Sequence, residues 1–231
     1  MLDSRIAAGM KAQLDLRRRA LAAGDRPLGW KVGFGAPAAM KSLGIAAPLV
    51  GFMTETSRVP PGDTVSLAGW ARPVAEPEVA VYLGKDLPGG ADARAAAAAI
   101  AALGPAIELA DLDKPPQDVT AILAGNIYHR RVILGPGDAG RAGGDVSGLC
   151  GRVFRRGHEI ATVDELEANT GNLVAIVAHV ANLLAAVGER LRADEIIICG
   201  SITPPLFIEA DETEVEYELE PVGDIAVRFT R

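Results

Sequence analysis

The sequence predicts an α+β fold in which a helix at the start precedes many short strands and two further helices. Gly and Pro number 26 and 15 among 231 residues, a frequency typical of short strands joined by turns. Apolar residues make up 49 % of the chain, which is enough for a full hydrophobic core. Strand and helix patterns do not alternate regularly, which argues against a doubly wound parallel sheet.

Charge and hydropathy narrow the class of protein. The chain has 23 basic and 30 acidic residues, and this acidic balance disfavours a nucleic-acid-binding protein. No apolar run reaches the ~18 residues of a membrane span, and the first twenty residues lack the apolar core of a secretory signal. Cys150 and Cys199 form neither a C-x-x-C pair nor metal-finger spacing. We therefore expect a cytoplasmic protein with reduced thiols and a single domain over residues 1–231.

The N-terminal third should contain one long helix and two short strands. Residues 3–24 have apolar side chains at roughly helical spacing, and Gly24 can cap the helix. The arginines at 17–19 are expected on its solvated face. The segments that follow are predicted to be a glycine-flanked strand, a short helix, a loop and a brief strand, at residues 28–34, 36–44, 44–51 and 65–67.

The clearest strand spans residues 74–83. Its side chains alternate, which places Val79 and Val81 on one face and Glu76 and Glu78 on the other. Pro77 cannot donate a hydrogen bond to a neighbouring strand, so we expect this end of the strand to be an edge or a bulge.

The rest of the chain should contain two helices and several strands. Asp92 can cap a helix that runs through the alanine-rich stretch to Leu103. Residues 171–187 form the most apolar predicted helix, and Gly188 can cap it. The other predicted elements are a strand, a short helix, a strand, a hairpin, a buried strand and a closing hairpin with a solvated acidic face, at residues 106–110, 121–127, 132–135, 153–160, 196–199 and 214–229.

Three carboxylates are the first candidates for chemistry. Glu76 and Glu78 share one face of a strand, and Glu108 lies in an apolar strand where a carboxylate is costly unless it is paired. If the three meet, a cation must relieve their repulsion, and hard oxygen ligands favour Mg²⁺ or Mn²⁺ over Zn²⁺. Spacing alone leaves two other interpretations open, a solvated edge for the first two and an arginine partner for Glu108.

Lys31 is the second candidate, because it lies in an apolar strand between Gly29 and Gly33. A lysine beside a hydrophobic pocket can bind a carboxylate or take part in proton transfer. The alternative is a surface lysine whose stem alone is buried. Among the histidines, His129 lies near a possible site, whereas His179 lies in an apolar helix and is expected to pack there. The sequence contains no G-x-S-x-G motif.

Together these segments resemble the 2-keto-4-pentenoate hydratase and 2-oxo-3-hexenedioate decarboxylase family of the fumarylacetoacetate hydrolase superfamily. The order and spacing of the motifs match over nearly the whole chain. The matching motifs are Gly29-Trp30-Lys31-Val32-Gly33, Leu43-Gly44-Ile45 with Pro48 and Gly51, Glu76-Pro77-Glu78-Val79-Ala80, Pro105-Ala106-Ile107-Glu108-Leu109, Asn126, Leu134-Gly135, Ala181-Asn182-Leu183-Leu184, Leu191 to Asp194, Gly200-Ser201-Ile202-Thr203 and Gly223-Asp224-Ile225-Ala226-Val227.

The resemblance implies a fold and a site. The fold is a mixed β-sandwich or β-roll of the fumarylacetoacetate hydrolase C-terminal type, with a helical N-terminal segment over residues 1–25. Members of the family are homo-oligomers, which implies the same for this chain. The implied site residues are the ligands of Mg²⁺ or Mn²⁺, Glu76, Glu78 and Glu108, the active-site lysine, Lys31, and the substrate-binding residues Ser201, Thr203 and Asn126.

The resemblance also implies a function, that of a lyase in the meta-cleavage catabolism of aromatic compounds. Such a lyase hydrates 2-hydroxypenta-2,4-dienoate or decarboxylates 2-oxo-3-hexenedioate through a dienolate that the metal stabilises. Two alternatives stay open, a C–C bond hydrolase or oxaloacetate-type decarboxylase of the same superfamily, and a non-catalytic relative that binds a small acid. No histidine precedes His129, which favours the lyase over the hydrolase.

The chain departs from the family pattern at three places. Leu49 and Gly125 stand where an acidic residue is common. His179-Val180 stands where a tryptophan is usual. These departures leave the implied metal ligands unchanged and bear on the choice between hydratase and other activities.

Overall fold

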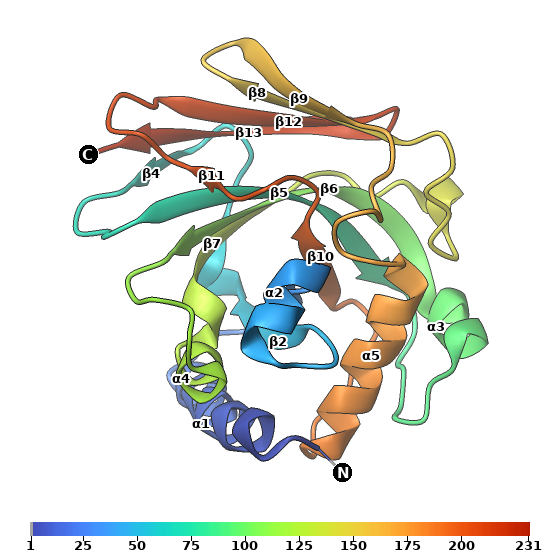
Figure 1. Ribbon diagram of the computed structural model, residues 1–231. Coiled ribbons are helices and arrows are strands. Elements are labelled where there is room, and N and C mark those ends of the chain that lie inside the picture. The colour runs from blue at the N-terminus through green and yellow to red at the C-terminus, as the bar shows by residue number, and fades with distance from the viewer. Residues whose placement is uncertain (1) are drawn as a thin grey trace.

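The computed structural model describes residues 2–231 and contains two stacked β-sheets, with most helices below the larger sheet as drawn (Figure 1). The larger sheet has the order β2-β1-β10-β5-β6-β7-β3, and β11 pairs with β5. Its strands are β1 (Pro27–Gly33), β2 (Leu49–Thr54), β3 (Arg58–Val59), β5 (Pro73–Leu83), β6 (Ile100–Asp111), β7 (His129–Leu134), β10 (Ile196–Ser201) and β11 (Leu206–Phe207).

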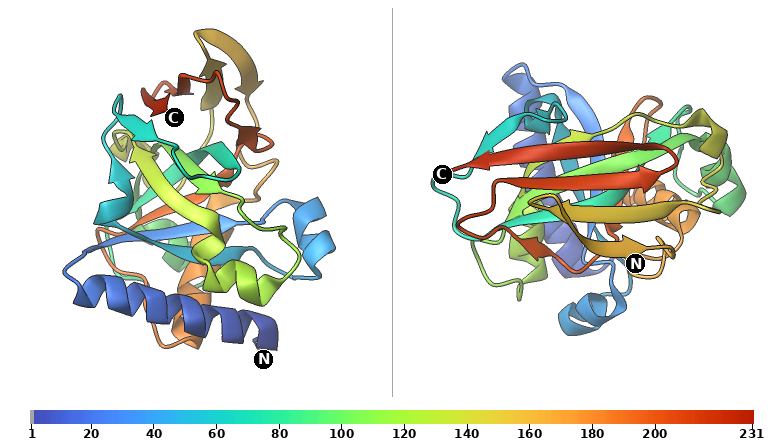
Figure 2. Two further views of the ribbon diagram at one scale, coloured as in Figure 1. Left: turned by 90° about the vertical axis from the view of Figure 1, so that its left-hand side faces the viewer. Right: turned by 90° about the horizontal axis from the view of Figure 1, so that it is seen from above.

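The smaller sheet lies across the outer face of the larger one, as the view from above shows (Figure 2). In its order of pairing, its strands are β4 (Thr64–Ser66), β13 (Gly223–Thr230), β12 (Glu214–Glu220), β8 (Cys150–Arg155) and β9 (His158–Val163). The helices are α1 (Ser4–Ala22), α2 (Pro37–Leu43), α3 (Ala93–Ala99), α4 (Val119–Ala124) and α5 (Leu173–Ala186). None of these helices is both long enough and apolar enough to cross a membrane.

The larger sheet curls into a roll. Its two edge strands, β2 and β3, are joined only by the short 3₁₀ turn Glu55–Ser57, so the edges must approach one another. Asn126, just before β7, holds the backbone of Phe52 in β2 from both sides, with two hydrogen bonds of 2.9 Å. The α+β fold with a helical start and a β-roll is therefore confirmed, and the roll has an inner face that can enclose a site.

Side-chain alternation divides the larger sheet into an inner and an outer face. Val79 and Val81 of β5 point outward into the main core, which the smaller sheet covers with residues such as Tyr217. Ala80 points inward, into a separate apolar cluster inside the roll. That cluster contains Leu28, Met53, Ala80, Ala106, Val132, Leu134, Ile196 and Ile198. The predicted two-faced pattern of this strand is confirmed, and it directs Glu76 and Glu78 inward.

The strand end at Pro77 was predicted to be an edge or a bulge, and the structure shows a bulge beside it but no edge. The strand that contains it is not an edge, because β5 lies between β10 and β6. A bulge is present on the neighbouring strand, where the register of β10 shifts between Ile198 and Ser201. The proline therefore lies where regular pairing is interrupted, as its missing N–H requires.

Two predicted boundaries are wrong because tertiary pairing overrides local propensity. The alanine-rich helix ends at Ala99, and the next residues form the start of β6, which pairs with β5 as far back as Ile100. Alanine favours a helix over most other residues by only roughly 0.5 kcal/mol per residue. The eleven paired positions between β5 and β6 outweigh this helix propensity. The segment predicted as a loop at 44–51 runs into strand β2 at Leu49, whose six residues are all buried.

Arg17 is a further correction, because it does not lie on a solvated helix face. It is 7 % exposed and stacks over the ring of Trp30 at 4.9 Å. Its guanidinium also lies 3.4 Å from Glu189 and 3.8 Å from Glu195. The arginine therefore attaches α1 to the outer face of β1, the strand that carries Lys31.

Candidate metal centre and active site

The register of β5 and β6 brings three glutamates together on the inner face of the roll. Glu76 and Glu108 are direct cross-strand partners, and such partners have adjacent side chains. Glu78 lies two residues along the same strand and therefore on the same face. The three residues each offer one carboxylate oxygen, and these oxygens lie within 4.8 Å of one another. The interpretation of Glu76 and Glu78 as a solvated edge is wrong, because Glu78 is completely buried.

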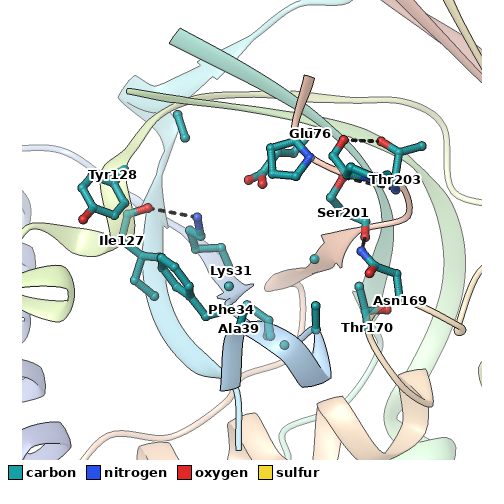
Figure 3. A pocket seen from close by; sticks show the side chains of 18 of the residues that line it. Lys31, Phe34, Ala39, Glu76, Ile127, Tyr128, Asn169, Thr170, Ser201 and Thr203 are labelled. Atoms are coloured by element: carbon teal, nitrogen blue, oxygen red, sulfur yellow. Dashed lines mark hydrogen bonds between the residues drawn. The ribbon is translucent and has the colours of Figure 1, made fainter. Parts of the chain in front are cut away.

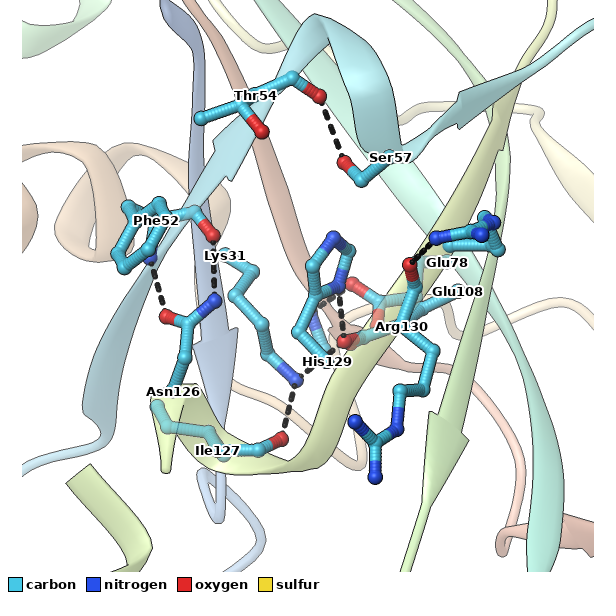
Figure 4. A network of polar contacts seen from close by, with 12 residues as sticks. Lys31, Phe52, Thr54, Ser57, Glu78, Glu108, Asn126, Ile127, His129 and Arg130 are labelled. Carbon is cyan, nitrogen blue, oxygen red and sulfur yellow. Dashed lines mark hydrogen bonds and ion pairs between the residues drawn. The ribbon is translucent and has the colours of Figure 1, made fainter. Parts of the chain in front are cut away.

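Lys31 reaches the same group from β1. Its Nζ lies 2.6 Å from Oε1 of Glu108 and donates a second hydrogen bond to the carbonyl of Ile127 at 3.2 Å (Figure 4). Gly51 on β2 makes room for the lysine stem, because a Cβ there would lie 2.9 Å from Cγ of Lys31. With 2 % exposure, Lys31 is not a surface lysine, and it takes the place of the arginine considered as a partner of Glu108.

The two buried carboxylates each have one anchored oxygen and one free oxygen. Oε2 of Glu78 accepts a hydrogen bond from the backbone N–H of Gly200 at 2.5 Å, and Oε1 of Glu108 is held by Lys31. The other oxygens, Oε1 of Glu78 and Oε2 of Glu108, are buried without a hydrogen-bond partner in residues 2–231. Gly200 has a φ of +94°, so the bulge in β10 aims its N–H at the site.

This arrangement fits a hard divalent cation. Buried carboxylate oxygens without partners are costly, and a cation bound among them removes that cost. The donor set consists of oxygen atoms, which suits Mg²⁺ or Mn²⁺. Anchoring one oxygen of each buried carboxylate leaves the other oriented for a ligand bond, as outer partners do in metal sites.

The charges of the site perturb each other's protonation. Burial and the charge of Glu108 raise the pKa of Glu76 to about 7, and the same causes raise the pKa of Glu78 well above its ordinary range. Burial alone would raise the pKa of Glu108 as well, but Lys31 and His129 outweigh it and leave it lowered. Burial lowers the pKa of Lys31, yet the three nearby carboxylates outweigh that effect and raise it. Lys31 is therefore cationic beside an ionised Glu108.

The raised pKa of Glu76 predicts how stability depends on pH when the protein holds no metal. Between the ordinary range of a glutamate and pH 7, the folded chain keeps a proton that the unfolded chain has lost. The free energy of unfolding should therefore fall as pH rises from about 4.5 to about 7. Mg²⁺ at millimolar concentration should remove most of this slope. Urea denaturation with chelator and with Mg²⁺ at several pH values tests this, and equal slopes in the two series would contradict it.

A left-handed turn positions the backbone next to Lys31. Asn126, Ile127 and Tyr128 have φ values of 56°, 52° and 62°, which for residues with side chains cost about 1–3 kcal/mol each. This turn aims the carbonyl of Ile127 at Lys31 and brings Tyr128 to a cavity. The turn is held by Asn126, whose amide oxygen and nitrogen are both bonded to Phe52. The role of Asn126 in substrate binding stays a prediction. This geometry does not support it, because both amide atoms are bonded to Phe52 and the residue is not part of the cavity lining.

A cavity of about 380 Å³ opens beside the glutamates (Figure 3). Lys31 and Glu76 are the charged residues that reach it among those described. Ser201 and Thr203 line it, and their role in substrate binding stays a prediction. The remaining lining residues are uncharged and include Phe34, Ala38, Ala39, Leu112, Tyr128, Asn169, Thr170, Pro204 and Pro205.

His129 is the site residue that sequence reasoning left open. Its Nδ1 lies 2.8 Å from Oε1 of Glu108, so it holds the same oxygen as Lys31. The signal in the sequence was its place directly after Asn126, Ile127 and Tyr128. The structure adds that β7 pairs with the strand that carries Glu108. Asn169 and Thr170 in the cavity wall gave no signal, because they lie in a turn far along the chain. His179 packs as predicted, with Nε2 2.9 Å from the carbonyl of Pro48.

The amino-acid sequence is similar to those of known proteins. Residues 32–230 match the sequence profile described as fumarylacetoacetate (FAA) hydrolase C-terminal. The chain is 29 % identical to the 4-oxalocrotonate decarboxylase of Pseudomonas putida, over 94 % of this chain and 83 % of that protein. It is 28 % identical to the 2-hydroxyhexa-2,4-dienoate hydratase of Comamonas testosteroni, again over 94 % and 83 %.

A solved structure supports the same grouping. The 4-oxalocrotonate decarboxylase of Pseudomonas putida G7, complexed with magnesium and adipate, superposes with a TM-score of 0.88. The match covers 97 % of this chain and 86 % of that one, at 26 % sequence identity. The relatives thus include both a decarboxylase and a hydratase.

Proposed function

The chain belongs to the fumarylacetoacetate hydrolase C-terminal family, and we propose that it is a divalent-metal-dependent lyase acting on a small unsaturated 2-oxo acid by hydration or decarboxylation. The observation that carries this proposal is the group of three glutamates beside a buried lysine at the edge of a ligand-sized cavity. The names of the relatives, a decarboxylase and a hydratase, support the reaction class.

Glu76, Glu78 and Glu108 would hold Mg²⁺ or Mn²⁺. When bound, the ion supplies a Lewis acid that withdraws electrons from an oxygen of the 2-oxo acid. Lys31 contributes a fixed positive charge to the cavity lining, where it can bind the substrate carboxylate and favour the build-up of negative charge. The roll around the site excludes water from the lysine, which strengthens this electrostatic effect.

The position of His129 favours a lyase over a hydrolase. A hydrolase of this kind needs a base that can activate a water molecule near the substrate. His129 is the histidine nearest the glutamates among the described residues, but it is absent from the cavity lining. Its Nδ1 is occupied by Glu108 and its Nε2 is buried. It therefore serves as a support for Glu108 and does not present a base to the cavity.

Product analysis tests the proposed function. The protein with 5 mM Mg²⁺ is incubated with 2-hydroxypenta-2,4-dienoate and, separately, with 2-oxo-3-hexenedioate, and the products are identified by NMR. We expect a hydrated oxo acid from the first or CO₂ from the second. Cleavage of an acylpyruvate into two acids would instead identify a hydrolase, and binding of both acids without turnover would identify a non-catalytic relative.

We also propose that the protein works in the cytoplasm as a homo-oligomer, as its resemblance to the family implies. Cys150 and Cys199 are unpaired in the structure, which is compatible with a reducing compartment. Light scattering coupled to size-exclusion chromatography tests the oligomer, and a mass of one chain at micromolar concentration would contradict it.

A further inference from the structure

The cavity contains few charged residues. Lys31 and Glu76 are the only charged residues among the described residues that line it. Lys31 is already paired with Glu108 at 2.6 Å. The remaining wall therefore holds no cation that could neutralise a second negative charge on a ligand.

Three polar residues of the wall, Asn169, Ser201 and Thr203, have donors that are already used within the protein. The amide nitrogen of Asn169 donates to the carbonyl of Ser201 at 2.7 Å. The hydroxyl of Ser201 lies 3.4 Å from the carbonyl of Pro77, and the hydroxyl of Thr203 donates to the carbonyl of Pro204 at 3.0 Å. These three side chains therefore have few donors left for a carboxylate, whereas they can meet a neutral ligand.

The opposite wall is aromatic and aliphatic. The rings of Phe34 and Tyr128 lie 6.5 Å apart at 56°, and Figure 3 shows them together on one side of the cavity. Both residues adopt left-handed backbone conformations, with φ values of 57° and 62°. Strained conformations of this kind persist where the surrounding structure holds them and are concentrated at functional sites. Leu112 and Ala39 continue the same apolar lining.

Two basic residues that share a second cavity with Tyr128 lie outside the lining of this one. Arg130 and Lys114 line a separate cavity of about 190 Å³. Arg130 lies 3.4 Å from Asp111 and 4.0 Å from Asp113, so its charge is neutralised there. Tyr128 lines both cavities. It therefore lies between the glutamate site and the cavity that contains Arg130.

From these observations, and resting on the proposed function, we propose that the substrate is a 2-oxo monocarboxylic acid whose far end is uncharged and apolar. A dicarboxylic acid would place its second carboxylate against the half-buried Phe34, Tyr128 and Leu112, where no cation lines the cavity, and removing a charge from water without an opposite charge is unfavourable. The cavity volume of about 380 Å³ exceeds the lower limit of roughly 300 Å³ for sites that take drug-sized ligands, so it has room for an apolar tail.

This substrate class favours hydration over decarboxylation. Hydration adds one water molecule across a carbon–carbon double bond and needs no other co-reactant. Loss of CO₂ from the far end of the substrate needs a second carboxylate there, for which the cavity has no partner. The chain thus differs from the decarboxylase that it superposes on, whose structure holds the dicarboxylate adipate.

Binding of two unreactive acids of equal length tests the proposal. Protein saturated with Mg²⁺ is titrated by calorimetry with 2-oxohexanoate and with 2-oxoadipate, which differ only in the second carboxylate. We expect 2-oxohexanoate to bind about 100-fold more tightly, the effect of an uncompensated buried charge. A preference below tenfold, or a preference for 2-oxoadipate, would overturn the proposal and leave the proposed function standing. If neither acid binds, the proposed function fails together with it.

Two variants test whether the missing cation is the cause. Leu112→Arg and Ala39→Arg each place a cation in the apolar lining, and at least one should raise the affinity for 2-oxoadipate tenfold or more. If both variants fold, as judged by circular dichroism, and neither gains affinity, the cause assigned here is wrong. Arg130→Gln is the control and should change neither affinity by more than threefold. A larger loss of 2-oxoadipate binding in this variant would show that Arg130 serves the cavity and would overturn the proposal.

Discussion

Glu78→Gln should abolish Mg²⁺ binding and turnover while it makes the metal-free protein more stable. The amide removes one charge from three crowded carboxylates, and burial with neighbouring charge already raises the pKa of Glu78 well above its ordinary range. Removing that charge relieves repulsion in the absence of metal. It also removes a ligand, and the loss of Mg²⁺ affinity should exceed the 10–100-fold that outer partners of a metal site contribute, so we expect more than about 100-fold.

Calorimetric titration with Mg²⁺, turnover of a 2-hydroxydienoate and thermal denaturation with chelator measure the three effects. Glu218→Gln is the matched control, because Glu218 lies on the smaller sheet, where it forms an ion pair with Arg152. This control should leave Mg²⁺ binding and turnover unchanged. A Glu78→Gln protein that still binds Mg²⁺ with the affinity of the unmodified chain would contradict the assignment of the three glutamates as a metal site.

Lys31→Met should remove turnover without removing the metal. The methionine side chain has a similar length and fills the space beside Gly51, but it carries no charge. Loss of one preorganised electrostatic contact commonly lowers kcat by about 10²–10³-fold. Mg²⁺ affinity should stay the same or increase, because a cation 2.6 Å from a candidate ligand opposes metal binding.

Steady-state kinetics and calorimetry on the same preparation separate these two outcomes. Lys85→Met, at an exposed lysine after β5, is the matched control and should behave like the unmodified protein. A Lys31→Met protein with an unchanged kcat would show that the lysine is a structural counter-ion of Glu108 only. A protein that loses Mg²⁺ binding would show that Lys31 supports the metal site and not the substrate.

The sequence predicted the parts of the site that depend on local pattern. The alternation within residues 74–83 placed Glu76 and Glu78 on the face opposite Val79, and the structure has them there. An isolated glutamate between apolar neighbours indicated that Glu108 is buried, and it is. These features depend on the two-residue period of a strand, which is visible in any single segment.

Other parts depend on which segments meet, and the local pattern does not contain that information. The pairing of Glu76 with Glu108 is a matter of register between two strands. Asn126 contacts Phe52 across 74 positions of the chain, which closes the roll and occupies an amide expected to bind substrate. Arg17 is buried because Trp30 lies beneath it, and a run of three arginines looks the same whether or not such a ring is present.

We infer that the chemistry of this protein depends on a divalent ion held by Glu76, Glu78 and Glu108. The most direct test follows the absorbance of a 2-hydroxydienoate in protein treated with chelator, before and after Mg²⁺ is restored. We expect turnover to fall to background without the ion and to return fully at millimolar Mg²⁺. Unchanged turnover in the chelator-treated protein would contradict a catalytic role for this ion.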